Sequence, residues 1–234
     1  MSYVKIVNKI VSLLTIVTML ISFGFIKDDT QTCLYEQNER SNKIALTFDD
    51  GPHPKITNDI LETLEKYNIK ATFFVIGKNV DLYQNQLIKI HELGHEIGNH
   101  TNSHKQLTSL SKDEVAKEIK LCHDKVLRLT GVQMKVFRPP CGKINKSIHE
   151  IINKMGYQEV LWSIDTHDWS HETTENILKN VSKNVIGGDI VLFHDYISGK
   201  YSTVDVLNIL IPMLLEQGYE FVTISELINK YPPA

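Results

Sequence analysis

Two adjacent carboxylates, Asp49 and Asp50, stand where an apolar run ends and a Gly51-Pro52 turn begins. A strand that ends at this point carries both acids out of a sheet and into a loop. Paired acids can divide the work of a hydrolytic site, because one can hold a metal ion while the other accepts a proton. Asp-Gly-Pro is also an ordinary turn sequence. The pair therefore indicates chemistry only if other reactive residues converge on it.

Two histidines, His100 and His104, are four residues apart, and the first of them ends the short segment 96–100. In a helical turn, residues with this spacing lie on one face, so both imidazoles could bind one ion. Together with the carboxylate of Asp50 they would leave coordination positions open, as a catalytic zinc site requires. The alternative is a pair of surface histidines in a polar loop, which would be the better interpretation without Asp50.

A third histidine, His194, directly follows the apolar run 190–193. It could be a hydrogen-bonded core residue, or a general acid whose pKa is set by a carboxylate. Asp165 and Asp168 are the acids available to hold it. Trp169, beside them, is either a core residue or a platform on which a sugar ring stacks.

The elements that must position these residues alternate along the chain. Apolar runs predict strands over 43–50, 71–77, 96–100, 136–138, 157–165, 189–194 and 219–224. Helical periodicity predicts helices over 55–67, 80–93, 111–130, 145–155, 173–185, 201–217 and 225–231. This alternation favours parallel strands covered by helices, in a closed or nearly closed barrel. An open doubly wound sheet is the alternative, although no strand is followed by a nucleotide-binding glycine motif.

In barrels of this kind the active site lies at the carboxyl ends of the strands. Five predicted strands end there in an acid, a base or an arginine, in chain order Asp49-Asp50, His100, Arg138, Asp165 and His194. One such residue would mean little. Reactive residues at the ends of five strands predict a single active site at the carboxyl end of the barrel, which we call the mouth.

The N-terminal residues differ from the rest of the chain. Lys5 and Lys9 precede the uncharged, mostly apolar run 10–26, and this pattern predicts a signal peptide or membrane anchor over 1–27. Residues 28–42 are polar, which indicates a linker to a globular domain over 43–234. By the positive-inside rule the domain is exported, to the outer face of the membrane or to the cell wall.

The composition of the chain limits the classes of protein to which it can belong. The 234 residues are 42% hydrophobic, which suits one domain with a sizeable core, and we expect a monomer. A net charge of −3 gives no reason to expect a nucleic-acid partner. Cys33, Cys122 and Cys141 are odd in number and far apart, so neither a zinc ribbon nor a disulfide scaffold is indicated.

Five ordered motifs resemble those of the NodB-homology polysaccharide deacetylases, carbohydrate esterase family 4. They are TFDDGP at 47–52, HTNSH at 100–104, RPPCG at 138–142, DTHDW at 165–169 and LFH at 192–194. The resemblance covers essentially the whole predicted domain. It implies a distorted (β/α)7 barrel of parallel strands that hydrolyses N-acetyl groups, and sometimes O-acetyl groups, of polysaccharides.

The resemblance also implies a division of labour among the first three motifs. Asp49 would be the catalytic base, oriented by Arg138. Asp50, His100 and His104 would hold a divalent metal, usually Zn²⁺, with Co²⁺ or Mn²⁺ as alternatives. The metal would supply an activated water for attack on the acetyl carbonyl, and Asp49 would accept the proton.

The last motifs would supply the acid and the acetyl pocket. The resemblance makes His194 the general acid, paired with Asp168 in preference to Asp165, and places Leu192 against the acetyl methyl group. Cys141 stands where the family usually has tyrosine. The role at that position is a backbone N–H toward the oxyanion, which survives a side-chain change, although groove shape and sugar preference could differ.

Two functional hypotheses from different classes remain. The first is an exported, metal-dependent deacetylase that acts on peptidoglycan amino sugars, with chitin oligosaccharides and then O-acetyl xylan as the alternative substrates. The second is a catalytically silent wall protein that keeps the fold and binds glycan. The complete set of reactive residues favours the enzyme, because a silent relative usually lacks at least one.

Overall fold

The computed structural model describes residues 42–199 and 201–230 of the chain. The predicted signal or anchor and nearly all of the predicted linker lie outside these residues, and both stay predictions. Within the described part of the chain, no helix is both long enough and apolar enough to cross a membrane.

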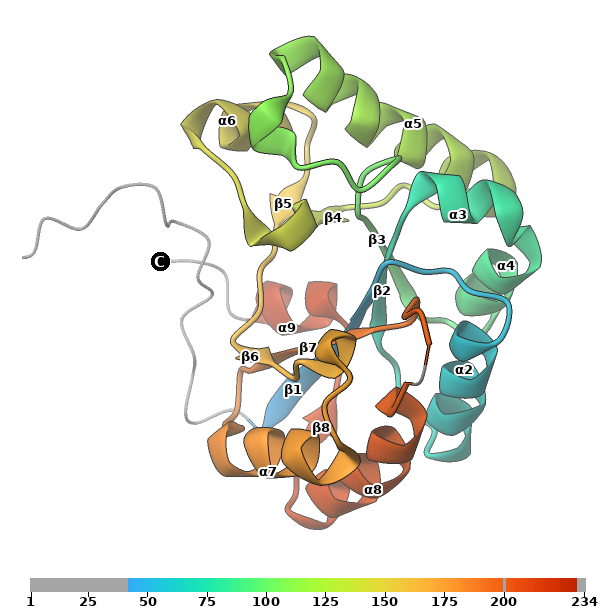
Figure 1. The fold of residues 1–234 in the computed structure, drawn as a ribbon, viewed down its shortest axis with the longest axis vertical. Helices are drawn as coiled ribbons and strands as arrows, with labels where there is room; N and C mark the ends of the chain where they lie inside the picture. Colours follow the sequence, from blue (N-terminus) through green and yellow to red (C-terminus); the bar gives the residue numbers. More distant parts are fainter. Residues whose placement is uncertain (1–41, 200, 231–234) are drawn as a thin grey trace, which may run out of the picture. The chain divides into compact units, whose positions relative to one another are not determined.

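Short parallel strands form one sheet in the described residues (Figure 1). Their bounds are β1 Lys43–Asp49, β2 Thr72–Val75, β3 Glu96–Asn99, β4 Val136–Phe137, β5 Gln158–Glu159, β6 Ile164–Asp165, β7 Ile190–His194 and β8 Glu220–Phe221. The order is β5-β4-β3-β2-β1-β7-β6, and β8 pairs with the first residues of β1. Every pair is parallel, so all carboxyl ends lie at one edge.

The sheet is strongly curled. Strands β5 and β6 lie at its opposite ends although only residues 160–163 separate them. An extended segment from Glu159 to Ile164 spans about 17 Å at most, whereas the ends of a flat sheet of this order would be about 29 Å apart. The sheet must therefore bend into an incomplete barrel, which confirms the predicted fold class. The single strand predicted over 157–165 is wrong, because its two ends pair with different strands.

Helices surround the sheet (Figure 1), and α9 packs against an apolar cluster that contains Ala45. Their bounds are α2 Ile56–Lys66, α3 Gly77–Leu82, α4 Gln84–Glu92, α5 Lys112–Thr130, α6 Lys146–Lys154, α7 Thr174–Asn184, α8 Thr203–Glu216 and α9 Ile224–Lys230. Short 3₁₀ turns span Leu107–Ser109, Pro140–Gly142 and Asp168–Ser170. The helix predicted over 80–93 is broken at Tyr83, whose φ of −131° and ψ of 52° are not helical.

Helix α5 is fixed at both ends by its own sequence. Ser111 accepts the N–H of Glu114, and the Glu114 carboxylate accepts the N–H of Ser111, which completes a capping box. Gly131 ends the helix with a φ of +74°, a conformation that costs glycine little. This long helix packs against α3 and α6 and carries a buried acid, Glu118, on its inner face.

Strand β1 separates two apolar clusters. Leu46 and Phe48 belong to the large cluster shared with the helices, whereas Ala45 belongs to a smaller cluster made mainly by the strands. Because side chains alternate along a strand, Thr47 and Asp49 share the face of Ala45. The inner face of the curled sheet is therefore apolar at its base and polar at its carboxyl edge.

Candidate active site

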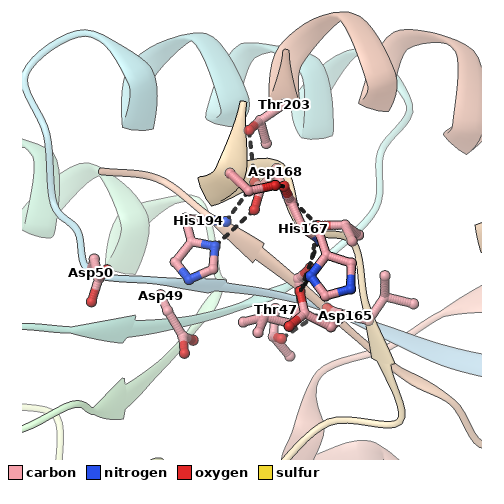
Figure 2. Close-up of polar contacts among 12 residues, drawn as sticks. Thr47, Asp49, Asp50, Asp165, His167, Asp168, His194 and Thr203 are labelled. Atoms are coloured by element: carbon pink, nitrogen blue, oxygen red, sulfur yellow. Dashed lines mark hydrogen bonds and ion pairs between the residues drawn. The ribbon is translucent and has the colours of Figure 1, made fainter. Parts of the chain in front are cut away.

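Reactive side chains from four strands meet at the carboxyl edge. They are Asp49 and Asp50 at the end of β1, His100 after β3, Arg138 after β4 and His194 at the end of β7. Asp49 and His194 are partners in the parallel register of β1 and β7. Figure 2 shows Asp49, Asp50 and His194 near one another, with Asp168 above the histidine and hydrogen-bonded to it.

Asp49 forms a buried ion pair with Arg138. Nη1 of Arg138 donates to Oδ1 of Asp49 and to Oγ1 of Thr47, both at 2.8 Å. The carbonyls of Val160 and Leu161 accept from Nε and Nη2 at 3.3 and 2.9 Å. Burial lowers the pKa of Arg138, and the charge of Asp49 opposes that effect. The arginine fixes one oxygen of Asp49, and the other faces the mouth 3.7 Å from Nε2 of His100.

Asp50, His100 and His104 form a candidate metal centre. Oδ1 of Asp50 lies 3.5 Å from Nε2 of His100 and 3.3 Å from Nε2 of His104. The three ligand atoms all lie within 4.8 Å of one another. This buried Oδ1 has no hydrogen-bond partner among the described residues. An orphaned carboxylate oxygen that faces two imidazole nitrogens fits a divalent cation, because such an ion would accept electron pairs from all three atoms.

The tautomer of His100 suits a metal ligand. Its Nδ1 lies 2.7 Å from the carbonyl oxygen of Arg138, which can only accept, so Nδ1 carries the proton and the Nε2 lone pair faces Asp50. Burial lowers the pKa of His100 more than the charges of Asp49 and Asp50 raise it. A neutral imidazole results, as metal ligation requires.

The two histidines are brought together by a loop, so the predicted helical turn is wrong. Thr101 and His104 have positive φ values of 69° and 55°. Asn99 Oδ1 accepts the N–H of Thr101 at 2.9 Å, and Thr101 Oγ1 accepts the N–H of His104 at 3.0 Å. The imidazole centroids of His100 and His104 are 4.9 Å apart. The spacing of the motif identified the pair, but hydrogen bonds within the loop orient it.

Glu118 is a functional candidate that the motifs did not reveal. From α5, its two oxygens accept the N–H and the hydroxyl of Ser103, both at 2.8 Å, directly before His104. The available signal was periodicity, because Glu118 falls on the buried helical face with Val115 and Cys122. A buried charged residue needs a hydrogen-bonding partner, and here the partner is Ser103 in the segment 100–104, which we call the histidine loop.

His194 is held by Asp168. Nδ1 of His194 lies 2.8 Å from Oδ1 of Asp168, and the backbone N–H of His194 donates to Oδ2 at 2.9 Å. Thr203 Oγ1 also donates to Oδ2, at 2.9 Å (Figure 2). Burial lowers the pKa of His194, but the bond to Asp168 and the charges of Asp168, Asp49 and Asp50 outweigh it and raise the pKa to about 9. The imidazole is therefore protonated at neutral pH.

Asp165, the other acid considered for His194, is not brought to it. Its Oδ1 accepts the N–H of His167 at 2.8 Å and lies 3.6 Å from Nδ1 of the same residue. Trp169 is 52% exposed, so its ring lies on the surface and not in the core. The fourth motif thus supplies Asp168 as the partner of His194 and Trp169 as an exposed aromatic residue nearby in the sequence.

The remaining predicted residues lie at the mouth or on the inner face. Leu192 is buried and pairs in register with Thr47, so it shares the inner face of the sheet. Cys141 is exposed and has a φ of +56°, in the turn directly after Arg138 and Pro139-Pro140. Asp195, to which the sequence assigned no role, is fully buried. Burial raises the pKa of Asp195 to about 7, and the hydrogen bond from Thr57 opposes the shift.

Comparison with known proteins agrees with this geometry. A family model described as polysaccharide deacetylase matches residues 36–160. The chain is 41% identical to a peptidoglycan-N-acetylglucosamine deacetylase of Bacillus cereus, over 80% of this chain and 88% of that protein. It is 39% identical to the peptidoglycan-N-acetylmuramic acid deacetylase PdaC of Bacillus subtilis, over 79% of this chain and 38% of the relative.

A solved structure shows the same fold. The Bc1960 peptidoglycan N-acetylglucosamine deacetylase, crystallised in complex with an N-oxidanyl-benzamide, superposes with a TM-score of 0.79 at 35% identity, over 82% of this chain and 90% of that one. The chain belongs to the polysaccharide deacetylase family. The predicted family, fold and enzyme class are thereby confirmed.

Proposed function

We propose that this protein removes N-acetyl groups from peptidoglycan amino sugars, at the outer face of the membrane or in the cell wall, with a zinc ion. One observation carries the proposal. A base, Asp49, and an acid, His194, are register partners beside Asp50, whose Oδ1 is orphaned, and each of the two has its own buried partner. The relatives named as peptidoglycan deacetylases support this choice of substrate.

The residues present fit the ion. Asp50, His100 and His104 would hold it, and a set of two imidazoles and one carboxylate favours zinc, with cobalt or manganese as substitutes. Such an ion, when bound, polarises a carbonyl oxygen and increases the acidity of water.

Asp49 is suited to act as the base. Arg138 holds one carboxylate oxygen, so the other is free to accept a proton from the attacking water at the mouth. The guanidinium that holds this oxygen is itself fully buried, so its position is fixed by the surrounding chain. Arg138 therefore acts as an orienting partner for the base.

His194 is suited to act as the acid. Asp168 binds Nδ1, which leaves Nε2 to give its proton to the departing amine. Proton donation is needed because an amide anion is a very poor leaving group. The backbone N–H of Cys141 would stabilise the oxyanion, a contribution that is typically worth about 10²–10³ in rate. Leu192 offers an apolar wall on the inner face for the acetyl methyl group.

The test is acetate release from purified peptidoglycan, compared with chitin oligosaccharides and acetylated xylan, by the zinc-loaded protein. We expect release from peptidoglycan above the level of an Asp49→Asn control. If acetate were released preferentially from chitin oligosaccharides or xylan, that glycan would take the place of peptidoglycan as the proposed substrate. No release from any of the three by a protein that contains zinc would favour the silent glycan-binding alternative.

A further inference from the structure

A buried carboxylate, Asp195, lies against the loop after Asp50, yet it belongs neither to the acid–base pairs nor to the candidate ligands. Its side chain is inaccessible to solvent. Within the described part of the chain its Oδ1 has no hydrogen-bond partner. A carboxylate that is buried with one oxygen unused is costly. Its position therefore calls for a function.

Asp195, directly after β7, contacts the end of β1, the loop after Asp50 and the first turn of α2. Its backbone N–H donates to the carbonyl of Asp49 at 3.0 Å. Its Oδ2 accepts the hydroxyl of Thr57 at 2.7 Å, and that hydroxyl oxygen accepts the N–H of His53, also at 2.7 Å. The backbone of Gly51 lies directly against the same carboxylate. The segment that begins at Asp50 is thus fixed at both of its ends.

The contact with Gly51 is especially close. A Cβ at this position would lie 2.1 Å from Oδ2 of Asp195, which is well inside any real contact distance. Only glycine lets the peptide lie directly against the carboxylate. The preceding residue, Asp50, has a φ of +77°, and such a conformation persists in a non-glycine residue only where the surroundings hold it. The direction of the Asp50 side chain depends on that backbone.

We propose that Asp195 is a positioning residue for the metal centre. By packing against Gly51 and binding Thr57, it holds the backbone of Asp50 in the conformation that turns its carboxylate toward His100 and His104. Asp195 touches neither the ion nor the substrate, and acts through Asp50. The inference rests on the metal site of the proposed function, but it does not depend on which glycan is the substrate.

The test is zinc affinity, measured without substrate by competition with a chromophoric chelator. We expect Asp195→Ala to weaken zinc binding by about 10- to 100-fold, as loss of an outer partner of a ligand typically does. Asp195→Asn keeps an oxygen that can accept from Thr57, so it should recover most of the affinity. The absorption spectrum of the Co²⁺-loaded protein should change in the alanine variant and not in the asparagine variant.

Asp189 provides a matched control. It is a buried carboxylate at the other end of β7, roughly 20 Å away along the chain, and it accepts from Ser163 and from the N–H of Ile186. Asp189→Ala should lower the free energy of unfolding and leave zinc affinity unchanged. Equal zinc affinity in the wild type and in Asp195→Ala would overturn the inference, as would an equal loss in Asp189→Ala.

Thr57→Val keeps the inference testable if Asp195→Ala does not fold. The substitution preserves volume and removes only the hydroxyl that binds Oδ2, so zinc affinity should fall in the same direction by a smaller factor. Unchanged affinity in this variant would overturn the inference. Weakened zinc binding with no acetate release from any glycan by the wild type would support the inference and overturn the proposed function.

Discussion

The acid–base half of the site (Asp49, Arg138, His194 and Asp168) and the metal half (Asp50, His100 and His104) are stabilised in different ways. In the first half each reactive group has a protein partner of opposite charge at 2.8 Å. In the second, an orphaned oxygen and two imidazole nitrogens face one another at 3.3 and 3.5 Å.

The difference separates two kinds of preorganisation. The acid–base half is electrostatically complete as the chain folds, because segments that are distant in sequence supply its counter-charges. The metal half is complete only when a cation is added, and its backbone is held by neighbours in positive-φ conformations. The two halves should therefore respond differently to chelation, to substitution and to pH.

Removal of the metal should have the largest effect. Chelation is expected to reduce acetate release to background, and added zinc should restore it, because water activation is lost while Asp49 and His194 stay paired. Zinc at about 100 times its Kd should also raise the free energy of unfolding by about 2.7 kcal/mol. Thermal unfolding with and without zinc measures this. Full turnover by a verified metal-free protein would contradict the comparison.

The adjacent acids give the sharpest test of the two halves. Asp49→Asn should lower kcat by about 10²–10⁴-fold, the usual contribution of a general base, and should retain zinc. Asp50→Asn is the same change one residue later and should lose zinc, because an amide is a weaker ligand. Metal analysis of both purified variants gives the answer. Loss of zinc from Asp49→Asn would show that the two roles are misassigned.

Protonation of His194 should make stability depend on pH. Its pKa is about 9 in the folded protein against about 6.5 unfolded. The contribution to stability is therefore fully present below pH 6.5 and is lost as the pH rises through about 9. The linkage amounts to about 3 kcal/mol. Urea unfolding of the metal-free protein at both ends of this range measures it.

Asp168→Asn supplies the comparison for that measurement, because it removes the carboxylate that raises the pKa of His194. The variant should lose most of the decrease in stability between pH 6.5 and 9. Equal decreases in the wild type and in the variant would show that His194 does not carry the proton in question.

The smallest expected effect concerns the histidine loop. Glu118→Gln replaces charge-assisted bonds to Ser103 with neutral ones, at a cost of about 1 kcal/mol, or about fivefold in zinc affinity. Glu114→Gln, on the same helix but within the capping box, should leave zinc affinity unchanged. Equal zinc affinity in the two variants would show that Glu118 does not hold the loop.

Local patterns predicted most helices and the principal strands, because burial periodicity is a property of consecutive residues. They failed where pairing is long-range. Residues 158–159 and 164–165 fit the pattern of one strand. In the structure they are β5 and β6 at opposite ends of the sheet, where β5 pairs with β4 and β6 pairs with β7. Spacing also identified His100 and His104 while suggesting the wrong backbone, since the hydrogen bonds that shape the loop come from its polar side chains.

The sequence by itself determined which residues reach the mouth, because parallel strands place their carboxyl ends at one edge and the five motifs occupy those ends. Only the tertiary structure decided how these residues are held. The sequence offered both Asp165 and Asp168 for His194, and the bond to Asp168, like the placement of Asp195 and Glu118 behind the metal half, depends on distances between elements that are remote in sequence. Burial patterns carry no information on such distances, because they record which side chains avoid water and not which polar atoms meet.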